Sequence, residues 1–149
     1  MAIYAAQGTQ TAAPKTALTL ISTANGRSRL IEYTLSNVGA VTVDSQFEVK
    51  LERFTAAGTT TAVTPTGTDP SDPAATLFTA GSNATVEPTY TAGSVIDDKG
   101  VNPRGLYRWT AYAPDAEIIM PATASNGIGF LLSVLGGAVS VIVDAKVRQ

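Results

Sequence analysis

Residues 46–54 read Gln46-Phe47-Glu48-Val49-Lys50-Leu51-Glu52-Arg53-Phe54, and this stretch decides the fold class. Apolar Phe47, Val49 and Leu51 alternate with polar or charged neighbours, which is the two-residue repeat of a strand with one buried face. A helix would spread the same side chains around its circumference. The stretch therefore predicts a half-buried β-strand.

Similar alternation and short apolar segments recur along the chain, separated by turn-forming pairs such as Asn25-Gly26 and Asn126-Gly127. Further strands are expected at residues 16–21, 31–36, 59–64, 84–90, 107–111, 117–120, 127–132 and 139–147. No segment has a convincing helical period. We therefore expect an all-β protein, an antiparallel β-sandwich that is jelly-roll-like.

The chain length of 149 residues suits one domain. Residues 1–14 carry little charge, so we expect an N-terminal arm there, mobile in the free protein and removable over residues 2–13 without loss of the fold. Residues 15–149 would form the single β-sandwich domain. Residues 64–82 contain three prolines and should form one long Pro/Thr/Gly-rich surface loop.

The stretch from Ile128 to Val143 is the most apolar part of the chain. It is shorter than the roughly 20 residues that a membrane-spanning helix needs. Gly136-Gly137 interrupts it, and β-branched residues alternate after the interruption. This pattern favours a hairpin of two strands joined by a tight turn, and we expect no membrane partner.

The composition lacks the residues on which many enzyme mechanisms depend. There is no Cys and no His, which removes the usual zinc ligands, the Cys nucleophile and the Ser-His-Asp triad. Asp97-Asp98 is expected in a solvated turn, and Asp69 and Asp72 in a proline-flanked turn. We therefore expect no catalytic, cofactor-binding or metal-binding residues. A net charge of −2 also argues against a nucleic-acid partner.

Arg104, Arg108 and Trp109 form the most interesting group of side chains. Neighbouring strand residues face opposite sides, so Trp109 is expected in the core and Arg108 on the surface. Two interpretations of Arg108 remain open. It could pair with Glu48 or Glu52 on the sheet surface, or it could anchor an interface, where Arg and aromatic residues are enriched.

A family resemblance rests on several stretches that together cover most of residues 26–130. They are residues 26–33 (GRSRLIEY), 53–59 (RFTAAGT), 69–75 (DPSDPAA), 87–90 (EPTY), 102–109 (NPRGLYRW) and 121–129 (PATASNGIG). The chain resembles small structural proteins of tailed bacteriophages, the capsid decoration or cement proteins. The resemblance implies a β-rich trimer or dimer bound to the outer surface of a head shell.

We therefore expect a non-enzymatic virion structural protein that binds the outer surface of an assembled phage capsid through the major capsid protein and stabilises the capsid. The candidate capsid or subunit interface residues are Ile3, Tyr4, Arg104 and Arg108. The apolar composition, 44% hydrophobic, favours a homo-oligomer, most simply a trimer.

Two alternative functions stay open. The first is a phage tail or baseplate component, and the second is a carbohydrate-binding surface module, which could share the same sandwich fold. A sugar site needs an exposed aromatic ring on which the sugar can stack. The candidates outside the expected core are Tyr4, Tyr90 and Tyr112.

Overall fold

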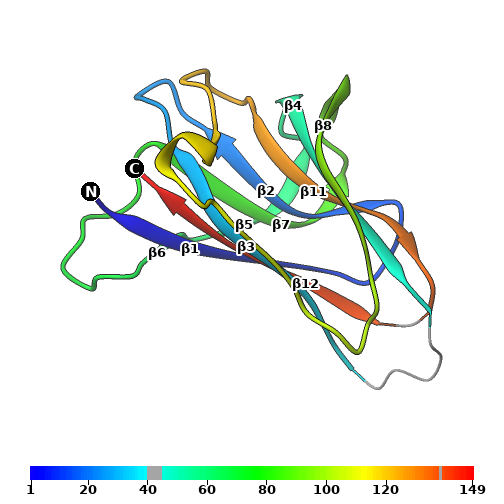
Figure 1. Ribbon diagram of the computed structural model, residues 1–149. Helices are drawn as coiled ribbons and strands as arrows, with labels where there is room; N and C mark the ends of the chain where they lie inside the picture. The colour runs from blue at the N-terminus through cyan, green and yellow to red at the C-terminus, as the bar shows by residue number, and fades with distance from the viewer. Residues whose placement is uncertain (40–44, 138) are drawn as a thin grey trace.

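The computed structural model describes residues 1–39, 45–137 and 139–149, and in them two antiparallel sheets pack face to face (Figure 1). The first sheet contains β1 (Ile3–Gln10), β3 (Arg29–Val38), β6 (Thr66–Gly67), β9 (Tyr107–Thr110), β10 (Ile118–Ile119) and β12 (Ser140–Arg148). The second contains β2 (Lys15–Ser22), β4 (Phe47–Ala56), β5 (Thr59–Val63), β7 (Phe78–Val86), β8 (Thr89–Val101) and β11 (Gly127–Leu135). The sole helical element in the described residues is the single 3-10 turn Pro114–Ala116.

The strand order is that of a jelly roll. In the first sheet β1, β12, β3 and β9 are neighbours, and in the second β2, β11, β4 and β8 are neighbours. Strands β1 to β4 alternate between the sheets, and the first strand pairs along its whole length with the last, from Ile3 opposite Arg148 to Gln10 opposite Val141. The predicted antiparallel, jelly-roll-like β-sandwich is confirmed.

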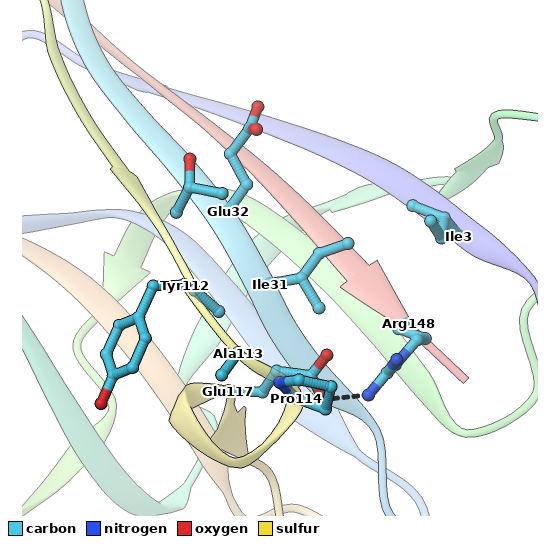
Figure 2. Close-up of a pocket in the computed structure, with 10 residues that line it drawn as sticks. Ile3, Ile31, Glu32, Tyr112, Ala113, Pro114, Glu117 and Arg148 are labelled. Carbon is cyan, nitrogen blue, oxygen red and sulfur yellow. Dashed lines mark hydrogen bonds and ion pairs between the residues drawn. The ribbon is translucent and has the colours of Figure 1, made fainter.

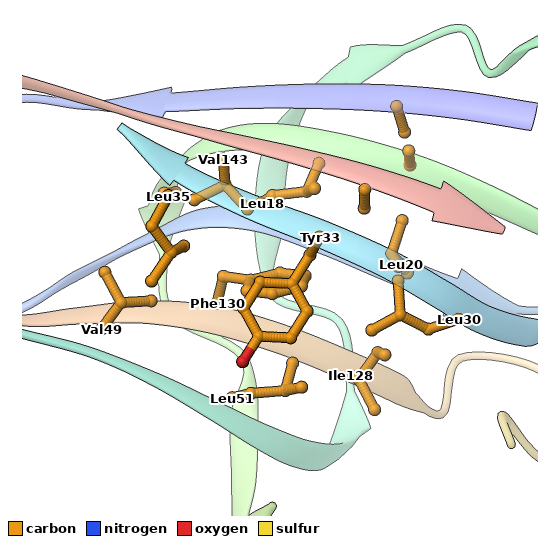
Figure 3. Packing of buried hydrophobic residues seen from close by; sticks show 14 of the residues in the cluster. Leu18, Leu20, Leu30, Tyr33, Leu35, Val49, Leu51, Ile128, Phe130 and Val143 are labelled. Atoms are coloured by element: carbon orange, nitrogen blue, oxygen red, sulfur yellow. The ribbon is translucent and has the colours of Figure 1, made fainter. Parts of the chain in front are cut away.

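The core lies between the two sheets and follows the alternation seen in the sequence. Inward-facing side chains of β4, such as Val49 and Leu51, meet Phe130 of β11 and Tyr33 and Leu35 of β3 (Figure 3). The rings of Tyr33 and Phe130 lie edge to face with centroids 5.2 Å apart. Strand β12 buries Val141, Val143, Ala145 and Val147, as its pattern predicts.

The N-terminal residues do not form the expected arm. They form β1, which lies between β12 and β6 and buries Tyr4, Ala6 and Gln10. The connection to β2 contains a cis peptide bond between Ala13 and Pro14. The sandwich domain therefore begins at β1 rather than at residue 15.

The apolar stretch around Gly136-Gly137 forms two strands, as expected, but not a hairpin. β11 pairs with β2 and β4 in the second sheet, whereas β12 pairs with β1 and β3 in the first. The glycines therefore lie where the chain crosses between sheets. Within the described residues, no helix has the length and apolar character needed to cross a membrane.

The expected loop over residues 64–82 is shorter in the structure. Thr66 and Gly67 pair with β1 as β6, and β7 begins at Phe78, which is fully buried. The prolines keep residues 68–77 irregular, but the segment after them re-enters the core. Asp97 and Asp98 also differ from expectation, because they lie within β8 and pair with β4 rather than forming a turn.

Candidate binding surface

A groove on the outside of the first sheet is lined by Ile3, one of the four predicted interface residues. It has a volume of about 320 Å³ and lies between β1, β3 and β12 on one side and residues 110–117 on the other. Ile3, Ile31 and Pro114 form apolar parts of its lining, and Glu32, Glu117 and Arg148 contribute charged groups (Figure 2). We call this feature the outer groove.

One wall of the outer groove is held by an ion-pair cluster centred on Glu117. The Glu117 side chain is only 6% exposed and pairs with Arg148 at the end of β12 and with Arg29 at the start of β3, the latter at 3.4 Å. A nearly buried carboxylate requires such partners, because an unpaired buried charge is costly. The cluster therefore fixes the segment before β10 to the sheet.

A second ion-pair cluster lies at Glu32 on the same outer face. Its carboxylate is 2.9 Å from Lys146 and 2.5 Å from Arg108. Burial alone would raise the pKa of Glu32, but the hydrogen bonds and charges of Arg108 and Lys146 outweigh it and hold the pKa below its ordinary value. The charges on this face are thus largely neutralised within the protein.

The predicted pairing of Arg108 with Glu48 or Glu52 is wrong. Strand β9 pairs with β3 of the first sheet, which places Arg108 opposite Thr34 and within reach of Glu32. Glu48 and Glu52 belong to β4 of the other sheet. Trp109 faces inward as expected, yet it is only half-buried, because β9 is an edge strand, and its ring stacks on Tyr33.

Tyr112 is the exposed aromatic side chain of the outer groove. It is 93% exposed and projects from the wall of the groove (Figure 2). Tyr4 is buried against Phe78, and Tyr90 packs against Phe54 with its hydroxyl 2.7 Å from that of Thr16. Of the three tyrosines considered from the sequence, Tyr112 therefore offers its ring to a partner.

The four predicted interface residues do not form one site. Ile3 lines the outer groove and Arg108 borders it through Glu32. Tyr4 is a core residue, 1% exposed. Arg104 lies in the turn before β9. The first residue of β9, Tyr107, pairs with Leu35, so this turn lies farther along β3 than Glu32, which lines the outer groove. Sequence reasoning missed Glu117 and Arg148, which carry no motif and meet only through the fold.

Comparison with protein-family models, with curated proteins and with solved structures found no match to this chain. In the part of the chain that the structure describes, no group of three or more acidic side chains has the geometry to hold a metal ion. The outer groove can bind a partner through apolar contact and the Tyr112 ring, and its carboxylates are occupied by arginine and lysine.

Proposed function

We propose that this chain is a non-enzymatic virion structural protein that binds the outer surface of an assembled phage capsid and stabilises it. The observation that supports this proposal most directly is the outer groove, with its apolar lining and exposed Tyr112. Aromatic and arginine side chains near the desolvated centre of an interface carry most of the binding energy in many protein complexes. The resemblance to decoration proteins supplies the identity of the partner, the major capsid protein.

Stabilisation would follow from mass action. A protein that binds only the assembled shell stabilises it by about 2.7 kcal/mol per site when its free concentration is 100 times the dissociation constant. The protein needs no catalytic group and no small molecule for this effect. We propose that the protein is a homotrimer. Its three subunits could then contact neighbouring capsomers at the same time, which would add avidity.

The test compares particles that lack the protein with the same particles after addition of the purified chain. We expect undecorated particles to assemble but to rupture at lower temperature, and the added protein to restore the rupture temperature without a cofactor. Equal rupture temperatures would reject the cement role. Binding to isolated tails in the same experiment would instead support a tail or baseplate component.

A further inference from the structure

A second cavity lies at the open side of the sandwich, between the edge strands of the two sheets. Its volume is about 350 Å³, and its lining includes Asp97 and Lys99 of β8 and Tyr107 and Trp109 of β9. Sites for small ligands commonly have volumes of roughly 300–1,000 Å³. We call this cavity the edge pocket. It has room for one small molecule.

Aromatic rings form one side of the edge pocket. Trp109 stacks on Tyr33 with ring centroids 5.5 Å apart and an interplanar angle of 24°. The ring of Tyr107 lies 6.0 Å from that of Tyr33. Tyr33 is buried, whereas Tyr107 and Trp109 are half-buried and line the cavity. A ligand with an apolar face can therefore contact aromatic carbon there.

Two side chains of opposite charge form the polar side of the edge pocket. Asp97 and Lys99 pair with Leu51 and Val49 of β4, so their side chains point to the inner face of the second sheet. The Lys99 ammonium lies 2.5 Å from the Asp97 carboxylate. The same carboxylate accepts hydrogen bonds from the hydroxyl groups of Tyr33 and Tyr107, the latter at 3.3 Å.

These inward charges also protect β8, because an inward-pointing charge on an edge strand hinders pairing with another chain. Protection of β8 against pairing with another chain does not require an open cavity. Inward charges would protect the strand equally well if side chains filled the space beside it. Instead, a cavity of about 350 Å³ lies beside β8, and its lining contains aromatic rings, tyrosine hydroxyl groups and an ion pair. The combination indicates a ligand rather than protection alone.

The chemistry of the lining limits the class of ligand. Asp97 and Lys99 balance each other, so the pocket offers no net charge to attract an ion. A wholly apolar ligand would remove water from both charges without replacing its hydrogen bonds. A sugar ring supplies hydroxyl groups for the charged side and an apolar C–H face for the aromatic side. We propose that the edge pocket binds a neutral pyranose sugar.

This site is separate from the outer groove. Trp109 faces the edge pocket, while the next residue, Thr110, lines the outer groove on the opposite face of β9. Sugar binding therefore does not depend on the proposed capsid contact, and free protein is sufficient to test it. The test of sugar binding and the test of capsid binding are therefore independent, and failure of one proposal does not imply failure of the other.

Trp109 is the single tryptophan of the chain and lines this pocket, so a ligand bound there should change its fluorescence. The purified protein is titrated with glucose, galactose and N-acetylglucosamine, and saturation-transfer NMR of each sugar gives a second readout. We expect a saturable change in emission with at least one of these sugars. Absence of a saturable response to all of them in both measurements would overturn the proposal.

The variant Lys99→Met removes the ammonium group, and Asp97→Asn removes the negative charge of the carboxylate; both keep the approximate side-chain shape. Each should weaken the affinity about tenfold or more, because hydrogen bonds to charged groups contribute roughly 1.5–3 kcal/mol. Lys50→Met is the matched control, since Lys50 pairs with Glu48 and Asp98 on the outward face of the same strands and should leave the affinity unchanged. Wild-type affinity in both pocket variants would overturn the proposal, and if Asp97→Asn fails to fold, Lys99→Met decides.

Discussion

The hydroxyl of Tyr4 donates a hydrogen bond of 2.7 Å to the carbonyl oxygen of Pro73. This contact joins the first strand to the proline-rich segment that precedes β7. The ring of Tyr4 also packs edge-on against Phe78, with centroids 6.2 Å apart. The two segments that the sequence predicted as a mobile arm and a surface loop thus stabilise each other inside the fold.

Substitution of Tyr4 should measure this coupling. Tyr4→Phe keeps the ring and removes the hydrogen bond, so we expect the free energy of unfolding to fall by about 1 kcal/mol. Tyr4→Ala also leaves a cavity and should cost about 3–5 kcal/mol. Urea denaturation of both variants gives these values. Tyr112→Phe, at an exposed ring, is the control and should have wild-type stability. An unaffected Tyr4→Ala would show that the Tyr4 side chain does not couple the two segments.

Deletion of residues 2–13 should prevent folding. Strand β1 pairs with β12 over eight registered positions and with the short β6 on its other side, so the deletion removes an internal strand of the first sheet. Circular dichroism and proteolysis of the truncated chain test this expectation. A truncated protein with wild-type spectra and protease resistance would restore the interpretation of this segment as an arm.

Strands were predictable where the two faces of a strand differ in polarity, as at Phe47, Val49 and Leu51. Strand β1 lacks this contrast, because its inward positions after Tyr4 are Ala6, Gly8 and Gln10. Small and polar residues fit there because the sheets approach closely: a side-chain carbon added at Gly8 would lie 2.3 Å from the carbonyl oxygen of Ala17. Alternation of hydrophobicity cannot detect such a strand.

The partners of a strand were less predictable than its existence. β11 and β12 are adjacent in sequence, apolar and separated by Gly136-Gly137, which is also the local pattern of a hairpin. Which sheet each strand joins depends on contacts with β2, β4, β1 and β3, distant in sequence. Local sequence therefore indicates two strands but cannot distinguish a hairpin from a crossing between sheets.

Replacement of the close glycine tests how tightly the sheets pack. Gly8→Ala would place a carbon 2.3 Å from the Ala17 carbonyl oxygen and 2.7 Å from the Leu18 Cβ, neither of which can move without shifting β2. We expect a loss of stability of about 1–3 kcal/mol, the usual cost of overpacking a core. Gly105→Ala is the control, because its nearest contact would be an ordinary 3.4 Å. Equal urea midpoints for the two variants would contradict the close approach.

The Glu32 cluster should make part of the stability pH-dependent. The pKa of Glu32 lies below its ordinary value of 4.5, since burial, which would raise it, is outweighed by Arg108 and Lys146. A carboxyl group whose pKa is lower in the folded protein stabilises the fold above the unfolded-state pKa, and this contribution disappears as the pH falls through the folded-state pKa. Stability should therefore decline below about pH 4.5 more steeply in wild type than in Glu32→Gln. Parallel pH profiles from thermal unfolding would show that the cluster contributes nothing.

The candidate site was predictable in residue type but not in arrangement. The sequence shows the low charge and the absence of His and Cys, and it offered Tyr112 as one of three candidate exposed tyrosines, of which Tyr4 is buried. The pairing of Arg108 with Glu32 depends on the register between β9 and β3, and that of Arg148 with Glu117 on two segments far apart in the chain. These contacts require the tertiary fold.

Two substitutions test which part of the surface makes the proposed capsid contact. Tyr112 and Leu106 are both highly exposed, at 93% and 66%, but Tyr112 borders the outer groove while Leu106 lies in the turn next to Arg104. If the outer groove binds the shell, Tyr112→Ala should reduce the affinity roughly 30-fold, the effect of about 2 kcal/mol at an aromatic hot spot. Leu106→Ala should bind as wild type does.

Co-sedimentation with undecorated particles measures both affinities, and particles decorated with Tyr112→Ala should rupture at a temperature close to that of undecorated ones. The ion pairs of the groove are satisfied within the protein, and the proposed contact relies on apolar groups. Raising the salt concentration should therefore weaken wild-type binding little. The opposite pattern, with loss of binding in Leu106→Ala and none in Tyr112→Ala, would move the contact to the Arg104 end of the sandwich. Strong salt dependence would indicate that charged groups, rather than the Tyr112 ring, hold the protein on the shell.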